Sequence, residues 1–177
     1  MPKIIEGARE KILENARRRL FEKGYQHLSL REVAKESGIA TGTIYNYFAN
    51  KDYLIANIML EDWQNAIKKM EAGCADAASV KEGVFGICQS MDEFCAIYAS
   101  VWQQPAVAAA ATPDLEHRHR FLTEQLKEKV NCLLEKKGYE DKKQFTILIS
   151  ELILSSIGKE EVRQQLEELL ELLYPLK

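Results

Sequence analysis

Apolar residues recur three and four positions apart along most of the chain, which is the spacing of one face of an α-helix. This period predicts helices over residues 50–73, 80–102, 114–137, 141–156 and 159–174, with a short alanine-rich helix beginning at Pro105. No stretch alternates between apolar and polar residues as a half-buried strand would. We therefore predict an all-α protein.

Residues 29–51 carry a more specific pattern, which predicts two short helices joined by a tight turn. Ser29 and Glu32 have the spacing of a capping box at the start of the first helix. Gly38 is placed to end that helix, because glycine adopts the left-handed conformation without a Cβ clash. A restart after about four residues is the connection length of a helix-turn-helix.

The second of these helices, predicted over residues 41–48, should turn Ile44 and Phe48 inward and leave hydroxyl and amide side chains outside. Such groups suit DNA phosphates and base edges. At the start of the next helix, Lys51 and the helix N–H groups would form a phosphate seat. We expect phosphate contacts from Thr43, Tyr45, Tyr47 and Lys51, base-edge contacts from Arg31, Thr41, Gly42 and Asn46, and a further DNA contact at Ser29.

A longer set of spaced residues surrounds this motif. It comprises Arg9, Ile12-Leu13, Ala16, Leu20-Phe21, Gly24-Tyr25, Ser29-Leu30, Val33-Ala34, Gly38-Ile39, Gly42-Thr43-Ile44-Tyr45, Tyr47-Phe48, Lys51-Asp52 and Leu54. In this set the chain resembles the tetracycline-repressor (TetR) family of bacterial transcription regulators. It departs from the family at Ala40, where a serine is common and could cap the second helix. The resemblance implies a helix-turn-helix DNA-binding domain over residues 1–51 and a helical effector-binding and dimerisation domain over 52–177.

Charge is distributed unevenly between these two parts. Residues 1–51 carry ten Lys and Arg against six Asp and Glu, whereas residues 52–177 carry fourteen against twenty-one. A basic N-terminal part in an acidic chain indicates a nucleic-acid footprint on that part alone. Arg17, Arg18 and Arg19 are consecutive on a helix, and we interpret two of the three as part of a solvated face.

The last two predicted helices carry more apolar surface than one chain of this size can cover. The first is apolar over most of its circumference, and the second carries a leucine stripe. We predict a two-fold interface with a second copy, and the family resemblance also implies a dimer there. The alternative is packing wholly within one chain. The candidate interface residues are Phe145, Leu148, Leu152, Leu166, Leu169 and Leu173.

The family resemblance implies that the remaining helices enclose a small effector. An apolar stripe with two polar-tipped aromatics could line such a pocket, which would take a small apolar ligand. The alternative is that the same side chains fill the core, which is the commoner role of a stripe at helical spacing. The candidate residues are Phe85, Met91, Phe94, Tyr98 and Trp102.

Other classes of protein lack support in the sequence. The longest unbroken apolar run, residues 106–111, is far below the roughly 20 residues of a membrane span. The four cysteines are scattered, so we expect them to be reduced and to act as small apolar residues in a cytoplasmic protein. His117 and His119 point to different helix faces, so we expect no metal site. We find no phosphate loop or nucleophile motif, so we expect no enzyme and no cofactor.

The sequence thus predicts a homodimeric transcriptional regulator that binds a palindromic double-stranded DNA operator and is released from it by a small ligand. Two other regulators fit the same residues: one that needs its ligand in order to bind DNA, and one that has no effector. An enzyme is the rival from another class, and it would gain support if the protein bound no DNA yet turned over its ligand.

Overall fold

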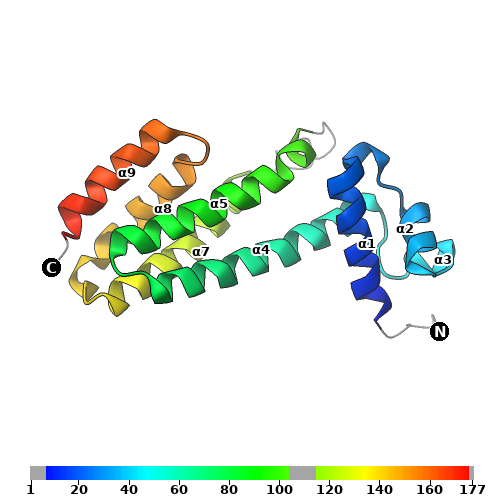
Figure 1. Ribbon diagram of the computed structural model, residues 1–177, viewed down its shortest axis with the longest axis horizontal. Coiled ribbons are helices and arrows are strands. Elements are labelled where there is room, and N and C mark those ends of the chain that lie inside the picture. The colour runs from blue at the N-terminus through cyan, green and yellow to red at the C-terminus, as the bar shows by residue number, and fades with distance from the viewer. Residues whose placement is uncertain (1–6, 104–114, 176–177) are drawn as a thin grey trace. The chain divides into compact units, whose positions relative to one another are not determined.

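The computed structural model describes residues 7–103 and 115–175, and these residues form helices without any strand (Figure 1). The predicted all-α class is confirmed. The predicted helix at Pro105 lies outside the described residues. The elements are α1 (Ala8–Lys23), η1 (Tyr25–His27), α2 (Leu30–Ser37), α3 (Thr41–Ile44), α4 (Lys51–Asp76), α5 (Val80–Trp102), α7 (Leu115–Lys136), η3 (Glu140–Phe145), α8 (Thr146–Ser155) and α9 (Glu160–Leu173).

The described residues divide into two compact units. The first holds residues 7–64 and 97–103, and the second holds 65–96 and 115–175. Two helices belong to both units, because α4 passes from one to the other after Gln64 and α5 passes back after Ala96. The predicted functional boundary after Lys51 coincides with the first residue of α4 and stays a prediction.

In the first unit, α1 packs against α2 and α2 packs against α3 around an apolar core. The two residues predicted to face inward from the recognition segment, Ile44 and Phe48, are both fully buried in it. Burial of such side chains is the main term that stabilises a small helical cluster. The other core residues are Ile12, Leu13, Ala16, Leu20, Val33, Ala34, Leu54 and Ile58.

In the second unit, α7 packs against α8 and α8 against α9. Gly83 of α5 approaches α7 closely, because a Cβ built on it would lie 2.6 Å from Leu133 Cδ2. Ion pairs connect the outer surfaces, with Arg163 of α9 2.7 Å from Asp92 of α5 and Lys129 of α7 2.5 Å from Glu71 of α4. No described helix has the length and apolar character needed to cross a membrane.

Two predicted helix boundaries differ from the structure. Gly73 does not end α4, because its φ is not positive and the Ala77 N–H still donates to the Gly73 carbonyl at 3.0 Å. A helical glycine costs only about 1 kcal/mol relative to alanine, so the helix continues to Asp76. The helix predicted from Asp141 instead begins as the 3₁₀ segment η3 and becomes α-helical at Thr146.

Candidate DNA-binding interface

The helix-turn-helix has the predicted geometry at its turn. Ser29 is extended, and its carbonyl accepts the first helical bond of α2 from the Val33 N–H at 3.0 Å. Gly38 ends α2 with φ 73°, in the left-handed region, and the Ile39 N–H donates to the Ala34 carbonyl at 3.0 Å. The chain therefore reverses tightly and starts α3 at Thr41, three residues after Gly38.

The capping box predicted at Ser29 is wrong. Ser29 occupies the N-cap position, but its side chain makes no capping hydrogen bond. The Glu32 carboxylate lies instead 2.5 Å from the Arg19 guanidinium. A charge-assisted bond to a nearly buried arginine is stronger than a neutral bond to a backbone N–H, so Glu32 turns toward α1.

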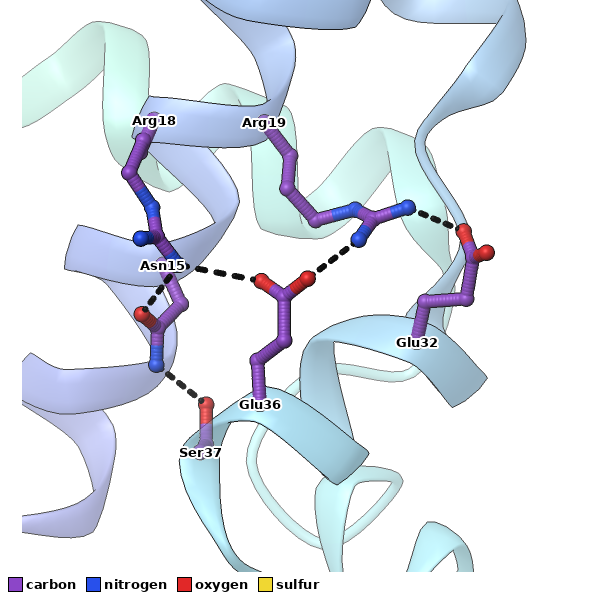
Figure 2. Close-up of polar contacts among 6 residues, drawn as sticks. All are labelled: Asn15, Arg18, Arg19, Glu32, Glu36 and Ser37. Atoms are coloured by element: carbon purple, nitrogen blue, oxygen red, sulfur yellow. Dashed lines mark hydrogen bonds and ion pairs between the residues drawn. The ribbon is translucent and has the colours of Figure 1, made fainter.

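Figure 2 shows how α1 and α2 are joined by this arginine, which lies between the carboxylates of Glu32 and Glu36. The side chain of Arg19 is only 7% exposed. Arg18 reaches Glu36 from the other side at 3.2 Å, and the Asn15 amide donates to the Ser37 hydroxyl at 3.1 Å. This polar cluster fixes the first helix of the motif against α1.

The same contacts refine our interpretation of two of the three consecutive arginines as a solvated face: Arg18 is 56% exposed, but all three pair with carboxylates. Arg17 pairs with Glu61 at 3.0 Å and with Asp62 at 2.9 Å, and Arg18 and Arg19 belong to the polar cluster. Burial raises the pKa of the Glu36 carboxyl, but the Arg19 hydrogen bond and the charges of Arg19, Arg18 and Lys23 lower it by more. Glu32 and Glu36, four apart on one helix face, indicate that a cation lies between them, but their spacing does not indicate which helix supplies it.

The recognition segment is less regular than predicted. The α-helix α3 covers only residues 41–44, and after it the Asn46 and Tyr47 N–H groups donate three residues back, at 3.1 and 3.0 Å. No side chain caps α3, since its N-cap is Ala40. Glycine and three β-branched residues, which make up its four positions, also lower its helix propensity. The segment therefore closes as tight turns that end at Phe48.

The predicted DNA contacts lie mainly on the surface. Thr41, Gly42, Tyr45, Asn46 and Arg31 are exposed, Tyr45 by 54%, whereas Thr43, Tyr47 and Ser29 are half-buried. A groove of about 490 Å³ brings Arg31 together with Thr41 across the turn. Lys35, which the sequence analysis did not single out, lines the same groove with Glu32, Ile39 and Ala40.

Several contacts hold the first turn of α4 around Lys51. The Asn50 side chain caps the helix by accepting the Tyr53 N–H at 2.8 Å. The Lys51 Nζ lies 3.9 Å from the centre of the Tyr25 ring, and the Tyr25 hydroxyl donates to Asp52 Oδ1 at 2.7 Å. Burial lowers the pKa of Lys51 and the Asp52 charge opposes that shift, while the hydrogen bond to Asp52 is the largest cause of a raised Tyr25 pKa.

The five predicted ligand residues all lie on α5, but they fall in different units. Met91, in the second unit, is fully buried, and Phe85 and Phe94 are half-buried there. Tyr98 and Trp102 belong to the first unit, where the buried Tyr98 hydroxyl donates to Asp62 at 2.5 Å and its ring lies 6.2 Å from Trp102. A cavity lined by these residues stays a prediction.

The six predicted interface residues differ in exposure. Leu166 is fully buried within the chain, whereas Leu148 is 47% exposed, and Phe145, Leu152, Leu169 and Leu173 are half-buried. Two further apolar side chains that the prediction omitted, Ile147 and Leu172, are strongly exposed beside them in sequence.

No cluster of three or more potential metal ligands occurs in the described part of the chain. His119 lies 2.7 Å from Glu151. All four cysteines are thiols: Cys74 and Cys88 are buried as predicted for small apolar residues, but Cys132 is exposed.

This helix-turn-helix matches a known family model. The model describes bacterial regulatory proteins of the tetR family, and it matches residues 12–58, from α1 to the first turns of α4. Residues 12–58 therefore belong to the tetR family of DNA-binding domains. Members of this family are transcription factors and not enzymes.

Relatives of this chain carry names of regulators. The HTH-type transcriptional regulator HbdR of Aromatoleum sp. (strain CIB) is 25% identical over 76% of the chain and 58% of its own length. A fatty acid metabolism regulator protein of Bacillus subtilis (strain 168) is 35% identical over 41% of the chain and 37% of its own length. The chain therefore matches less than two thirds of either relative.

Among solved structures, a transcriptional regulator of the TetR/AcrR family from Thermobifida fusca shares the fold, with a TM-score of 0.57 and 19% identity. That likeness covers 96% of this chain and 98% of the other.

Proposed function

We propose that this TetR-family protein acts in the cytoplasm as a homodimeric repressor, which binds a palindromic double-stranded DNA operator and is released by a small ligand. The observation that carries the DNA-binding part is the surface formed by the recognition segment and the start of α4. Thr41, Tyr45 and Asn46 are exposed on it, and Asn50 caps the helix that presents Lys51.

Within this surface we assign two kinds of contact. Tyr45 and Lys51, with Thr43 and Tyr47, would bind phosphates, which fix orientation without reading sequence. Asn46 would bind base edges, with Thr41, Gly42 and Arg31, because an exposed amide can make a bidentate contact with adenine. The groove residue Lys35 adds positive charge beside Arg31.

The distribution of ion pairs supports the same surface. Arg17, Arg18 and Arg19 each pair with carboxylates, so their charge is largely neutralised within the protein. The positive charge offered to DNA would come instead from Arg31, Lys35 and Lys51, which lie on or next to the recognition segment. This arrangement favours a compact footprint over a broad basic face.

The test is a comparison of three variants on two duplexes, one selected for tight binding from a random pool and one of mixed sequence. Tyr45→Ala and Lys51→Ala should weaken both, and Lys51→Ala should lower the slope of log affinity against log salt by about one unit. Asn46→Ala should lose about 1 to 3 kcal/mol of discrimination at one or two positions of the selected duplex. Lys68→Ala, an exposed lysine change in the second unit, is the matched control.

Three outcomes would count against this assignment. Equal effects of the three variants on both duplexes would remove the base-reading role of Asn46. An effect of Lys68→Ala as large as that of Lys51→Ala would place the phosphate contact elsewhere. A native protein that bound neither duplex but turned over a ligand would favour the enzyme.

Control by a ligand is supported by the path of α4. This helix starts beside the proposed phosphate seat and continues without a break into the second unit. A ligand that shifts its far end would therefore move Lys51. One relative is named for fatty acid metabolism, so a fatty acid is the first probe. The alternatives are a protein that binds DNA only with its ligand and a protein without any effector.

A further inference from the structure

Tyr25 contacts two consecutive residues of opposite charge at the start of α4. It lies in η1, between the first and second helices of the chain, and is half-buried. Its ring faces the Lys51 ammonium, with Nζ 3.9 Å from the ring centre, while its hydroxyl donates to Asp52 Oδ1 at 2.7 Å. One side chain therefore contacts both charged groups of the first helical turn.

Each of these contacts has a clear physical consequence. An ammonium over an aromatic face is attracted by the negative face of the ring and gives up part of its hydration. The hydrogen bond to the tyrosine hydroxyl holds the Asp52 carboxylate on the tyrosine side of the turn. A carboxylate that moved freely here would compete with a DNA phosphate for the neighbouring ammonium.

The order of the Lys51 side chain before DNA binds also affects affinity. Lysine has a long side chain with many rotamers, and fixing it on a phosphate reduces its conformational entropy. A lysine that is already held by a ring loses less of this freedom when the phosphate arrives. The Asn50 cap holds the backbone of the same turn through the Tyr53 N–H.

We propose that Tyr25 is a positioning residue for DNA binding: its ring orders the Lys51 ammonium at the start of α4, and its hydroxyl keeps the Asp52 carboxylate from competing with the phosphate. This inference rests on the proposed function, in which Lys51 binds a phosphate. Tyr25 itself contacts no DNA and acts through these two neighbours.

The test is a double-mutant cycle on a mixed-sequence duplex, with affinity measured by fluorescence anisotropy at several salt concentrations. Tyr25→Leu removes ring and hydroxyl, and it should lower affinity by about two- to fivefold and lower the salt slope toward that of Lys51→Ala. In the Lys51→Ala background, Tyr25→Leu should change neither quantity.

Tyr25→Phe separates the two contacts, because it keeps the ring and frees the carboxylate. Its affinity should fall less than that of Tyr25→Leu, and Asp52→Asn in the same chain should restore it. Equal losses from Tyr25→Leu with and without Lys51 would overturn the proposal, since such losses mean that Tyr25 only supports the fold.

A measurement without DNA tests the ring contact in the native protein. The ε-methylene protons of Lys51 should show a ring-current shift in NMR spectra, which Tyr25→Phe keeps and Tyr25→Leu abolishes. Unshifted protons in the native protein would overturn the proposal even if Tyr25→Leu failed to fold. If the native protein binds DNA and Lys51→Ala weakens binding, but the effects of Tyr25→Leu and Lys51→Ala are strictly additive, then only the proposed role of Tyr25 is refuted. Native protein that binds neither the mixed-sequence nor the selected duplex would refute the proposed function as well.

Discussion

Arg19 connects the first helix of the helix-turn-helix to α1. Its guanidinium lies between Glu32 and Glu36, so it joins α1 to both turns of α2 (Figure 2). Arg18 also contacts Glu36, but its side chain is 56% exposed. The two neighbours thus make similar ion pairs in different surroundings, which separates the effect of burial from the effect of charge.

Replacing Arg19 with methionine should destabilise the protein by about 1 to 3 kcal/mol, because two carboxylates then face each other without their shared partner. Arg18→Met should change the free energy of unfolding by less than about 1 kcal/mol, as expected for an exposed pair. Urea denaturation followed by circular dichroism measures both. Adding Glu32→Gln and Glu36→Gln to Arg19→Met should recover part of the loss; an equal loss in the two single variants would show that burial is unimportant.

The lowered pKa of Glu36 also predicts a pH dependence. A carboxyl whose folded pKa lies below its unfolded value of about 4.5 stabilises the folded state above that value. The contribution should disappear as the pH falls through the folded pKa. Glu36→Gln should therefore flatten the fall of the urea midpoint with acidification below about pH 5. Identical acid profiles for the variant and the native protein would contradict the pairing.

At the residue scale, the sequence predicted some of these features and missed others for a physical reason. Ile44 and Phe48 are buried and Tyr45 exposed as predicted, because helical period alone determines which side of the segment each occupies. The pairing of Glu32 with Arg19 could not be derived from local rules, since its partner lies on another helix. A local capping preference of about 1 kcal/mol lost to a charged contact.

Within single helices, two glycines of the second unit have opposite surroundings. Gly73 is exposed inside α4, and a Cβ added there would meet no atom within 4 Å. Gly83 is buried inside α5, and a Cβ there would lie 2.6 Å from Leu133 Cδ2. The sequence suggested that the first would end a helix, because glycine often does, but the glycine can also be tolerated within one.

Gly73→Ala should raise the free energy of unfolding by about 0.5 to 1 kcal/mol, because alanine restricts the unfolded chain and gains no clash. Gly83→Ala should lower it by about 1 to 3 kcal/mol, because the core leucine must move. Thermal and urea unfolding of the pair provide the comparison. A stabilising Gly83→Ala would show that α5 and α7 can separate at this point without loss.

Helix boundaries were predicted best where the sequence holds a strong start or stop signal. Gly138, with φ 73°, follows α7 as expected, and Ser79 accepts the Glu82 N–H at 3.1 Å to cap α5. The recognition segment was the least well predicted, because Ala40 offers no cap and the residues after it have low helix propensity.

For the molecule as a whole, assembly is tested best at a residue that is exposed in the single chain. Leu148→Glu should leave the fold intact, since a surface substitution usually changes stability by less than about 0.5 kcal/mol. In a dimer the same charge would lie unpaired in an apolar interface and separate the subunits. Leu166 is less informative, because it is buried within the chain and its loss would unfold the monomer.

Sedimentation should show dimers for the native protein and for Leu60→Glu, a matched change at a leucine of α4 that is 52% exposed, but monomers for Leu148→Glu. Affinity for a palindromic duplex should fall with the dimer, because half-sites about 34 Å apart need two linked recognition segments. A native monomer that binds the palindrome tightly would contradict the dimer.

Coupling between ligand and operator should depend on the contact between Tyr98 and Asp62. These residues lie just beside the two points where α5 and α4 pass between the units, after Ala96 and Gln64. Asp62 also forms an ion pair with Arg17, whose Nε lies 2.9 Å from Oδ1, so a polar chain joins α5 through α4 to α1. Burial, with the Asp62 bond, raises the pKa of Tyr98, so the hydroxyl stays protonated and continues to donate.

Native mass spectrometry of the freshly purified protein should identify any ligand it carries, and labelled operator can then be titrated with and without that ligand. Ligand and operator should weaken each other by the same factor, typically about 5- to 150-fold. Tyr98→Phe keeps the ring and removes the donor, so this factor should fall toward one while operator affinity without ligand stays close to native. An unchanged factor would exclude this contact as the path of coupling. A tightly bound ligand that leaves operator affinity unchanged in the native protein would refute ligand control itself.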